Sequence, residues 1–272
     1  KLCETGRLYY SLNEVEAPIL VIGSSRAHHH YVPKILTDSL ELEAYNLGSD
    51  GCFFSYNCCV INSILDRYNP KMIIWETSSN SLYEHDKDPM EILYPYYLSN
   101  DNIHRCIDAH TDKVDRIPLY CNLYRFNSKA HRVLIRYATG NKNQVDSLNG
   151  YLPLKQRHWQ ISEQKDNLQN TEDRISPVKE QQFIDVLDRL KEKGVEIVIV
   201  DSPYYYYERK NNESLSMMKG ICDSLNISFI DNTHLKGFYG NKEMFSDNVH
   251  LNAIGSEFYT IEFLEQIKKQ HQ

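Results

Sequence analysis

The stretch PILVIGSSRAHHH (residues 18–30) joins a short apolar run to a glycine, two serines and three histidines. The apolar residues are continuous rather than alternating, which is typical of a parallel strand covered on both faces. Gly23 permits a tight turn between a strand and a helix. We therefore expect a strand, a turn and a helix here. Ser25 should stand at or near the helix N-terminus, where free N–H groups favour an oxyanion.

Four further apolar runs end in polar or glycine-containing turns, at 42–51, 71–80, 195–203 and 227–232. Helical patterns lie between and after these runs. The clearest has Ser176 as an N-cap, Pro177 in its first turn and Gly194 as a stop. The last pattern has one expected apolar face, formed by Ile254, Phe258, Ile261 and Leu264. This alternation predicts a three-layer α/β/α fold around a doubly wound parallel sheet of the flavodoxin-like type.

One connection is much longer than a crossover between parallel strands requires. Residues 81–175 separate the third run from the helix that begins near Ser176. We expect a single domain over 1–272, with 81–175 as an insertion or lid. The insertion is rich in tyrosine, as is the stretch YYYY at 204–207. These rings suit either stacking on sugar faces or packing of the insertion onto the domain.

The composition is that of an ordinary globular protein, with 272 residues, 41% hydrophobic and 25% charged residues and a net charge of −7. The acidic balance argues against a nucleic-acid partner, and the most basic segment, 125–144, is interpreted as a solvated surface helix. No run approaches the roughly 20 apolar residues of a membrane span. The chain begins with Lys1 rather than Met, which is compatible with an upstream signal or membrane anchor that has been removed.

Cysteines and histidines give no sign of a metal or cofactor. Seven cysteines include no C-x-x-C pair, so we interpret them as mostly reduced core thiols. Three consecutive histidines, His28, His29 and His30, are expected to point in different directions on a helix. With no acidic cluster at a suitable spacing, we expect no metal site and no cofactor.

Candidate catalytic residues follow the predicted strands, where open parallel sheets bind their ligands. Ser25 follows the first strand, Gly51 the second and Asn80 the third, and the pair Asp247 and His250 comes a short loop after the fifth. A serine nucleophile needs a base, and the base needs an acid that orients it. We expect Asp247 to hold one imidazole nitrogen of His250 and to leave the other for Ser25. The backbone N–H groups of Ser25 and Gly51 and the amide of Asn80 then form an oxyanion hole.

Several neighbouring residues have open roles. Ser24 is a second candidate nucleophile, and Ser78 or Ser79 could replace Asn80 as the third oxyanion donor. Arg26 and Tyr204 are candidate substrate-binding residues, although Arg26 is equally suited to pairing with a nearby acid. Two strand-end acids, Glu76 and Asp201, suit the capping of a following turn better than catalysis.

The order of these residues resembles the SGNH/GDSL hydrolases. The family's block I serine matches Ser25 in VIGSSR, the block II glycine Gly51 in NLGSDG, the block III asparagine Asn80 in WETSSN, and the block V acid and base Asp247 and His250 in DNVHLN. The GSSR form looks like relatives that act on acyl groups of the cell envelope or exopolysaccharides, which often follow a membrane anchor. Block III departs from the usual Gly-x-Asn-Asp.

The resemblance implies a serine esterase that hydrolyses O-acyl groups, above all O-acetyl on carbohydrate, in the cell envelope, periplasm or extracellular space. An O-acyltransferase of cell-surface polysaccharide shares the same residues, and a non-catalytic glycan-binding relative is the third alternative. Two further alternatives stay open: another small ester as the substrate, and a cytoplasmic location.

Overall fold

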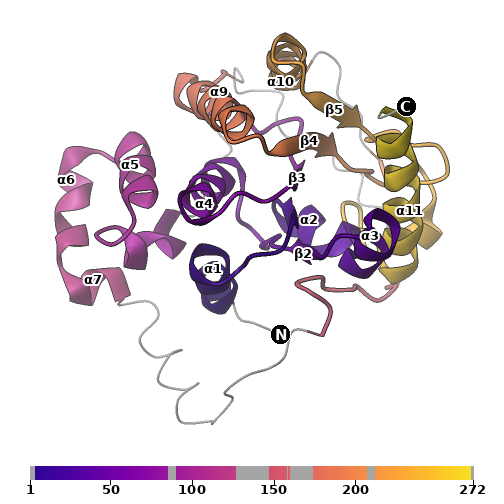
Figure 1. The fold of residues 1–272 in the computed structure, drawn as a ribbon, viewed down its shortest axis with the longest axis horizontal. Helices are drawn as coiled ribbons and strands as arrows, with labels where there is room; N and C mark the ends of the chain where they lie inside the picture. The colour runs from indigo at the N-terminus through magenta and orange to yellow at the C-terminus, as the bar shows by residue number, and fades with distance from the viewer. Residues whose placement is uncertain are drawn as a thin grey trace.

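A five-stranded parallel sheet forms the centre of the computed structural model, which describes residues 4–84, 90–126, 147–157, 159, 174–206 and 212–270 (Figure 1). The strand order is β2-β1-β3-β4-β5, the flavodoxin-like order. Each strand lies within one of the predicted apolar runs: β1 (Ile19–Ile22), β2 (Ala44–Asn46), β3 (Met72–Glu76), β4 (Glu196–Asp201) and β5 (Ser228–Asp231). The predicted α/β fold with a doubly wound parallel sheet is confirmed.

Helices cover both faces of the sheet, which explains the continuous apolarity of the strands. Alternate residues of β1 enter two separate cores: Leu20 and Ile22 one, Ile19 and Val21 the other. The first core lies under α1 (Glu4–Asn13), α4 (Phe54–Arg67), α9 (Pro177–Glu192) and α10 (Glu213–Ser224). The second lies under α2 (Ser25–His30), α3 (Pro33–Leu40) and α11 (Ala253–Gln270). The two helical layers are visible on either side of the sheet in Figure 1.

The expected apolar face of α11 is wrong. Ile254, Phe258 and Ile261 are about half exposed, and the residues that pack against the sheet are Tyr259, Phe263, Leu264 and Ile267. Of the four residues predicted to form the apolar face, only Leu264 lies in this core. Because this helix carries apolar residues around much of its circumference, its periodicity alone does not identify the face that meets the sheet.

The described part of the insertion is mostly helical. It contains η1 (Met90–Ile92), η2 (Tyr94–Tyr96), α5 (Asp101–His110), α6 (Lys113–Arg116), η3 (Ile117–Tyr120) and α7 (Asn122–Phe126). Its two ends lie together, because Tyr83 and Ile175 form an antiparallel bridge and Ser176 N–H donates to the Leu82 carbonyl. Residues 127–144, most of the predicted basic surface helix, lie outside the described residues. None of the helices that the structure describes is long and apolar enough to span a membrane.

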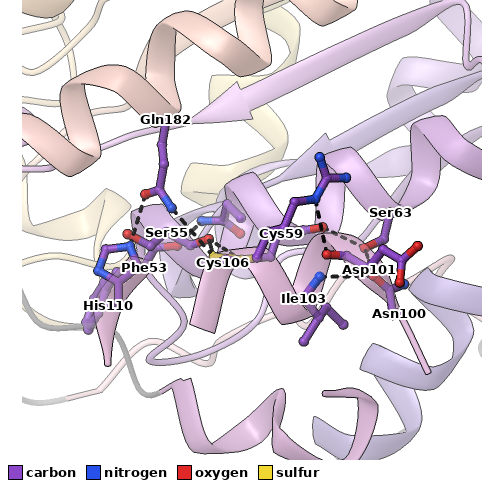
Figure 2. Close-up of a disulfide and its surroundings, with 12 residues drawn as sticks. Phe53, Ser55, Cys59, Ser63, Asn100, Asp101, Ile103, Cys106, His110 and Gln182 are labelled. Carbon is purple, nitrogen blue, oxygen red and sulfur yellow. Dashed lines mark hydrogen bonds between the residues drawn. A yellow bond between two sulfur atoms is a disulfide. The ribbon is translucent and has the colours of Figure 1, made fainter. Parts of the chain in front are cut away.

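A disulfide fastens this helical region to the domain. Cys59 of α4 and Cys106 of α5 are bonded across a sequence separation of 47 residues, with their Cα atoms 6.2 Å apart (Figure 2). The prediction of reduced thiols is therefore wrong for these two residues. It fits the buried Cys52, Cys58 and Cys222, while the fourth thiol of the described residues, Cys121, is exposed. The pairing depends on how α4 and α5 pack, which cysteine spacing does not encode.

Replacing both Cys59 and Cys106 with alanine is expected to lower the free energy of unfolding by about 2–4 kcal/mol, because a closed loop of this length restricts the unfolded chain. Urea unfolding measures the loss, with Cys121→Ser as the control that leaves stability unchanged. Alkylation of the denatured, unreduced wild type should spare Cys59 and Cys106. Full alkylation of both would contradict the disulfide.

Candidate active site

The turn after β1 places Ser25 at the first position of α2. Gly23 has φ +153°, and a Cβ atom there would lie 2.6 Å from the Glu76 carbonyl oxygen. No side chain fits this close approach, so only glycine allows the chain to leave β1 and enter the helix at once. Ser24 is the N-cap residue, and its side chain makes no capping hydrogen bond.

A tight loop presents His250 to this turn. The loop is closed by an antiparallel bridge between Phe245 and Leu251 and by a hydrogen bond from Ser246 N–H to the His250 carbonyl, 2.8 Å. Inside it, Asp247 Oδ1 accepts from the backbone N–H groups of Val249, 2.9 Å, and His250, 2.8 Å. The Asp247 side chain thus holds the Asp-x-x-His segment in a tight turn by bonding to the segment's own backbone.

Ser25, His250 and Asp247 form a continuous chain of contacts. His250 Nε2 lies 2.7 Å from Ser25 Oγ, and His250 Nδ1 lies 2.9 Å from Asp247 Oδ2. Partial burial alone would raise the pKa of Asp247, but its bonds with His250 and the Val249 N–H lower this pKa to about 2. The carboxylate is therefore charged at neutral pH, which fixes Nδ1 of His250 as the donor and leaves Nε2 to accept the Ser25 proton. Ser24 has no such contact with His250 among the described residues.

The candidate oxyanion donors lie in the turns after β2 and β3. Gly51 is exposed with φ +70°, and its N–H has no hydrogen-bond partner within the part of the chain that the structure describes. Asn80 Oδ1 accepts from Asn212 Nδ2, 3.2 Å, an orientation that turns the Asn80 amide nitrogen away from Asn212. Ser79 is fully buried, and its N–H donates to Asp201 Oδ2, 2.8 Å, which makes it unsuitable as an oxyanion donor.

Arg26 is not available to a substrate. Its side chain is only 4% exposed, and its guanidinium donates to Asp201 Oδ1, 2.6 Å, and lies 3.1 Å from Glu76 Oε1. Arg26 therefore has the other role considered from the sequence: it forms ion pairs with neighbouring acids. Tyr204 is half-buried and its ring lies 4.3 Å from the Arg26 guanidinium carbon, so it covers the ion pairs on one side.

A buried relay of polar contacts adjoins the candidate site through Leu251 and was not predicted from the sequence. Leu251 N–H donates to His30 Nε2, 3.0 Å, so His30 Nδ1 carries the proton and donates to Ser202 Oγ, 2.8 Å. Ser202 in turn donates to Glu76 Oε1, 2.8 Å. Burial raises the pKa of Glu76 to about 7 against the opposing effect of Arg26. The relay fixes Leu251, the residue that follows His250. Its signals in the sequence were Glu76 at the end of a predicted strand and His30, the last of three consecutive histidines.

The expected divergence of the three histidines is also wrong. The rings of His28 and His29 are stacked, with centroids 4.7 Å apart and an interplanar angle of 20°. Both contact Asp50, which lies in the turn after β2 next to Gly51. Only His30 points elsewhere, toward the relay described above. The helix α2 has only six residues. Successive residues of a helix are rotated by about 100°, but the side-chain torsion angles of His28 and His29 bring their rings together despite this rotation.

No protein-family model matches the sequence, and no curated protein matches it. A solved structure titled "Crystal Structure of TesA" is similar to this chain at 10% identity with a TM-score of 0.49, covering 92% of this chain and 98% of that one. We assign no residue a role from this likeness.

Proposed function

We propose that this protein is a serine esterase of the SGNH type, with Ser25 as nucleophile, His250 as general base and Asp247 as the acid that orients it. The observation that carries the proposal is the 2.7 Å contact between His250 Nε2 and Ser25 Oγ, continued by the contact between His250 Nδ1 and Asp247. A serine hydroxyl gains nucleophilic character when a correctly oriented imidazole can take its proton.

In this mechanism Ser25 Oγ attacks the ester carbonyl while its proton passes to His250 Nε2. The developing oxyanion accepts hydrogen bonds from the N–H groups of Ser25 and Gly51 and from the Asn80 amide, which Asn212 orients. Loss of one such donor costs about 3 kcal/mol of barrier in serine hydrolases. His250 then returns the proton to the departing alcohol, and an acyl group remains on Ser25.

The acyl-enzyme is resolved by water or by a sugar hydroxyl, which separates an esterase from an O-acyltransferase. We propose hydrolysis of O-acetyl groups on carbohydrate, a substrate class supported by the resemblance of VIGSSR to proteins of envelope polysaccharide modification. The Cys59–Cys106 disulfide supports an oxidising compartment such as the cell envelope. Acetate release from an acetylated oligosaccharide, compared with acetyl transfer to an added one, distinguishes the two reactions.

A fluorophosphonate probe is expected to add once to the wild-type protein, because it reacts with activated serines. The adduct should be absent from Ser25→Ala and retained in Ser24→Ala, the neighbouring serine that does not contact His250. Intact mass and peptide mapping give the stoichiometry and the position. Failure to label well-folded wild type would count against an activated serine and favour a glycan-binding relative, and labelling of Ser24 would move the nucleophile by one residue.

A further inference from the structure

Two histidines and a carboxylate meet beside the candidate active site. His28 Nδ1 lies 2.7 Å and His29 Nε2 lies 3.3 Å from Asp50 Oδ1, and the three ligand atoms all lie within 4.8 Å of one another. The two imidazoles are almost fully buried, whereas the Asp50 side chain is 44% exposed. The cluster is therefore enclosed by the two buried histidine rings and is open to solvent on the side of Asp50.

If the His29 ring is neutral, two hydrogen-bond acceptors face each other at 3.3 Å. Its Nδ1 lies 2.7 Å from the Leu152 carbonyl oxygen, which can only accept, so Nδ1 carries the proton. In a neutral ring Nε2 then presents a lone pair to the Asp50 carboxylate at 3.3 Å, although neither atom has a hydrogen to share. A positive charge between these atoms removes the repulsion.

We propose that His28, His29 and Asp50 bind a divalent transition-metal ion of the zinc class, through His28 Nδ1, His29 Nε2 and an Asp50 carboxylate oxygen. Two imidazoles and one carboxylate are a ligand set that such ions prefer. Tetrahedral coordination with bonds of about 2.0–2.2 Å separates the ligand atoms by roughly 3.3–3.6 Å. The His29–Asp50 distance of 3.3 Å already has this value, whereas the 2.7 Å between His28 Nδ1 and Asp50 Oδ1 must widen when the partly exposed Asp50 side chain turns to admit the ion. Three protein ligands leave one position for water or an oxygen ligand on the solvent side.

The surroundings of His29 and of the turn after β2 suit this role, whereas His28 Nε2 is buried without a hydrogen-bond partner among the described residues. Histidines that bind metals usually donate their second ring N–H to a carbonyl or carboxylate, as His29 does to Leu152. Gly48 brings the turn after β2 against α2, since a Cβ atom there would lie 2.3 Å from His28 N. The ion therefore ties this turn, which carries Gly51, to the helix that carries Ser25. The His29 ring also lies edge-on to His250, with centroids 5.5 Å apart.

The test uses chelator-treated, folded protein and measures Zn²⁺ binding by calorimetry and Co²⁺ binding by its visible absorption bands. Wild type is expected to bind one equivalent of each. Asp50→Asn keeps the size of a partly exposed side chain and should weaken binding at least about tenfold, because a metal ligand and a charge are lost. His29→Gln should have a similar effect.

The matched control is His110→Gln, which removes an exposed imidazole outside the cluster and should bind Zn²⁺ as wild type does. Circular dichroism of each variant verifies folding. The proposal is overturned if wild type binds no Zn²⁺, or if all four proteins bind it equally, as adventitious surface histidines would. Ring ¹⁵N signals that show His29 doubly protonated, with and without Zn²⁺, would also overturn it by assigning the positive charge to a proton.

Discussion

Replacing His250 with alanine is expected to lower kcat for an activated acetyl ester by at least about 10³-fold, since removal of one triad member disables the group as a unit. The physical reason is that Ser25 loses the only imidazole of the described residues that contacts its hydroxyl, 2.7 Å away. Initial-rate assays with p-nitrophenyl acetate measure the loss. Asp247→Asn should also be strongly impaired, because a neutral amide does not fix the same His250 tautomer.

His110→Ala is the control for this experiment, because this exposed histidine contacts Gln182 and lies outside the candidate site. Its turnover should equal that of wild type. If the folded His250→Ala variant turned over the ester as fast as wild type, the assignment of the triad would be wrong, and so would the proposed function. The proposed metal site has a binding readout of its own, so the two proposals can fail separately.

The second large effect concerns stability. Arg26→Met is expected to lower the free energy of unfolding by about 3–5 kcal/mol, because it leaves the carboxyl groups of Glu76 and Asp201 buried without their cation. Arg26 is 4% exposed, Glu76 2% and Asp201 fully buried. Urea unfolding at fixed pH measures the loss. The control is Lys34→Met in the next helix, whose pair with Asp38 is exposed and is expected to contribute less than about 1 kcal/mol.

The loss in Arg26→Met should depend on pH in a defined direction. Burial already raises the pKa of Glu76 to about 7 and also raises that of Asp201, and the loss of Arg26 raises both further. The folded variant then binds more protons than the unfolded chain, so its stability falls as pH rises. The difference from wild type is therefore larger at pH 8 than at pH 5. An equal loss at both values, or a loss below about 1 kcal/mol, would contradict the role assigned to these ion pairs.

The sequence by itself predicted the five strands, the helices at Ser25 and at 176–194, and the order in which the candidate site residues follow the strands. These features depend on neighbours along the chain: four buried apolar residues make β1, and Ser176 with Gly194 delimits α9. The Asp-x-x-His loop is local too, since Asp247 accepts hydrogen bonds from the backbone of the next few residues. The catalytic roles of Ser25, His250 and Asp247 stay predictions until they are assayed.

Only the tertiary structure decided which distant groups meet. Cys59 finds Cys106 because two helices pack together, and Asp50 reaches His28 and His29 because Gly48 lets one turn approach a helix backbone. Arg26 is an ion-pair partner rather than a substrate ligand because β3 and β4 end beside it. Such contacts depend on the crossing and stacking of elements far apart in sequence. Periodicity and spacing indicate which segments are helices and strands, but they do not say which residue of another segment lies against them, and in α11 they did not identify the face that packs against the sheet.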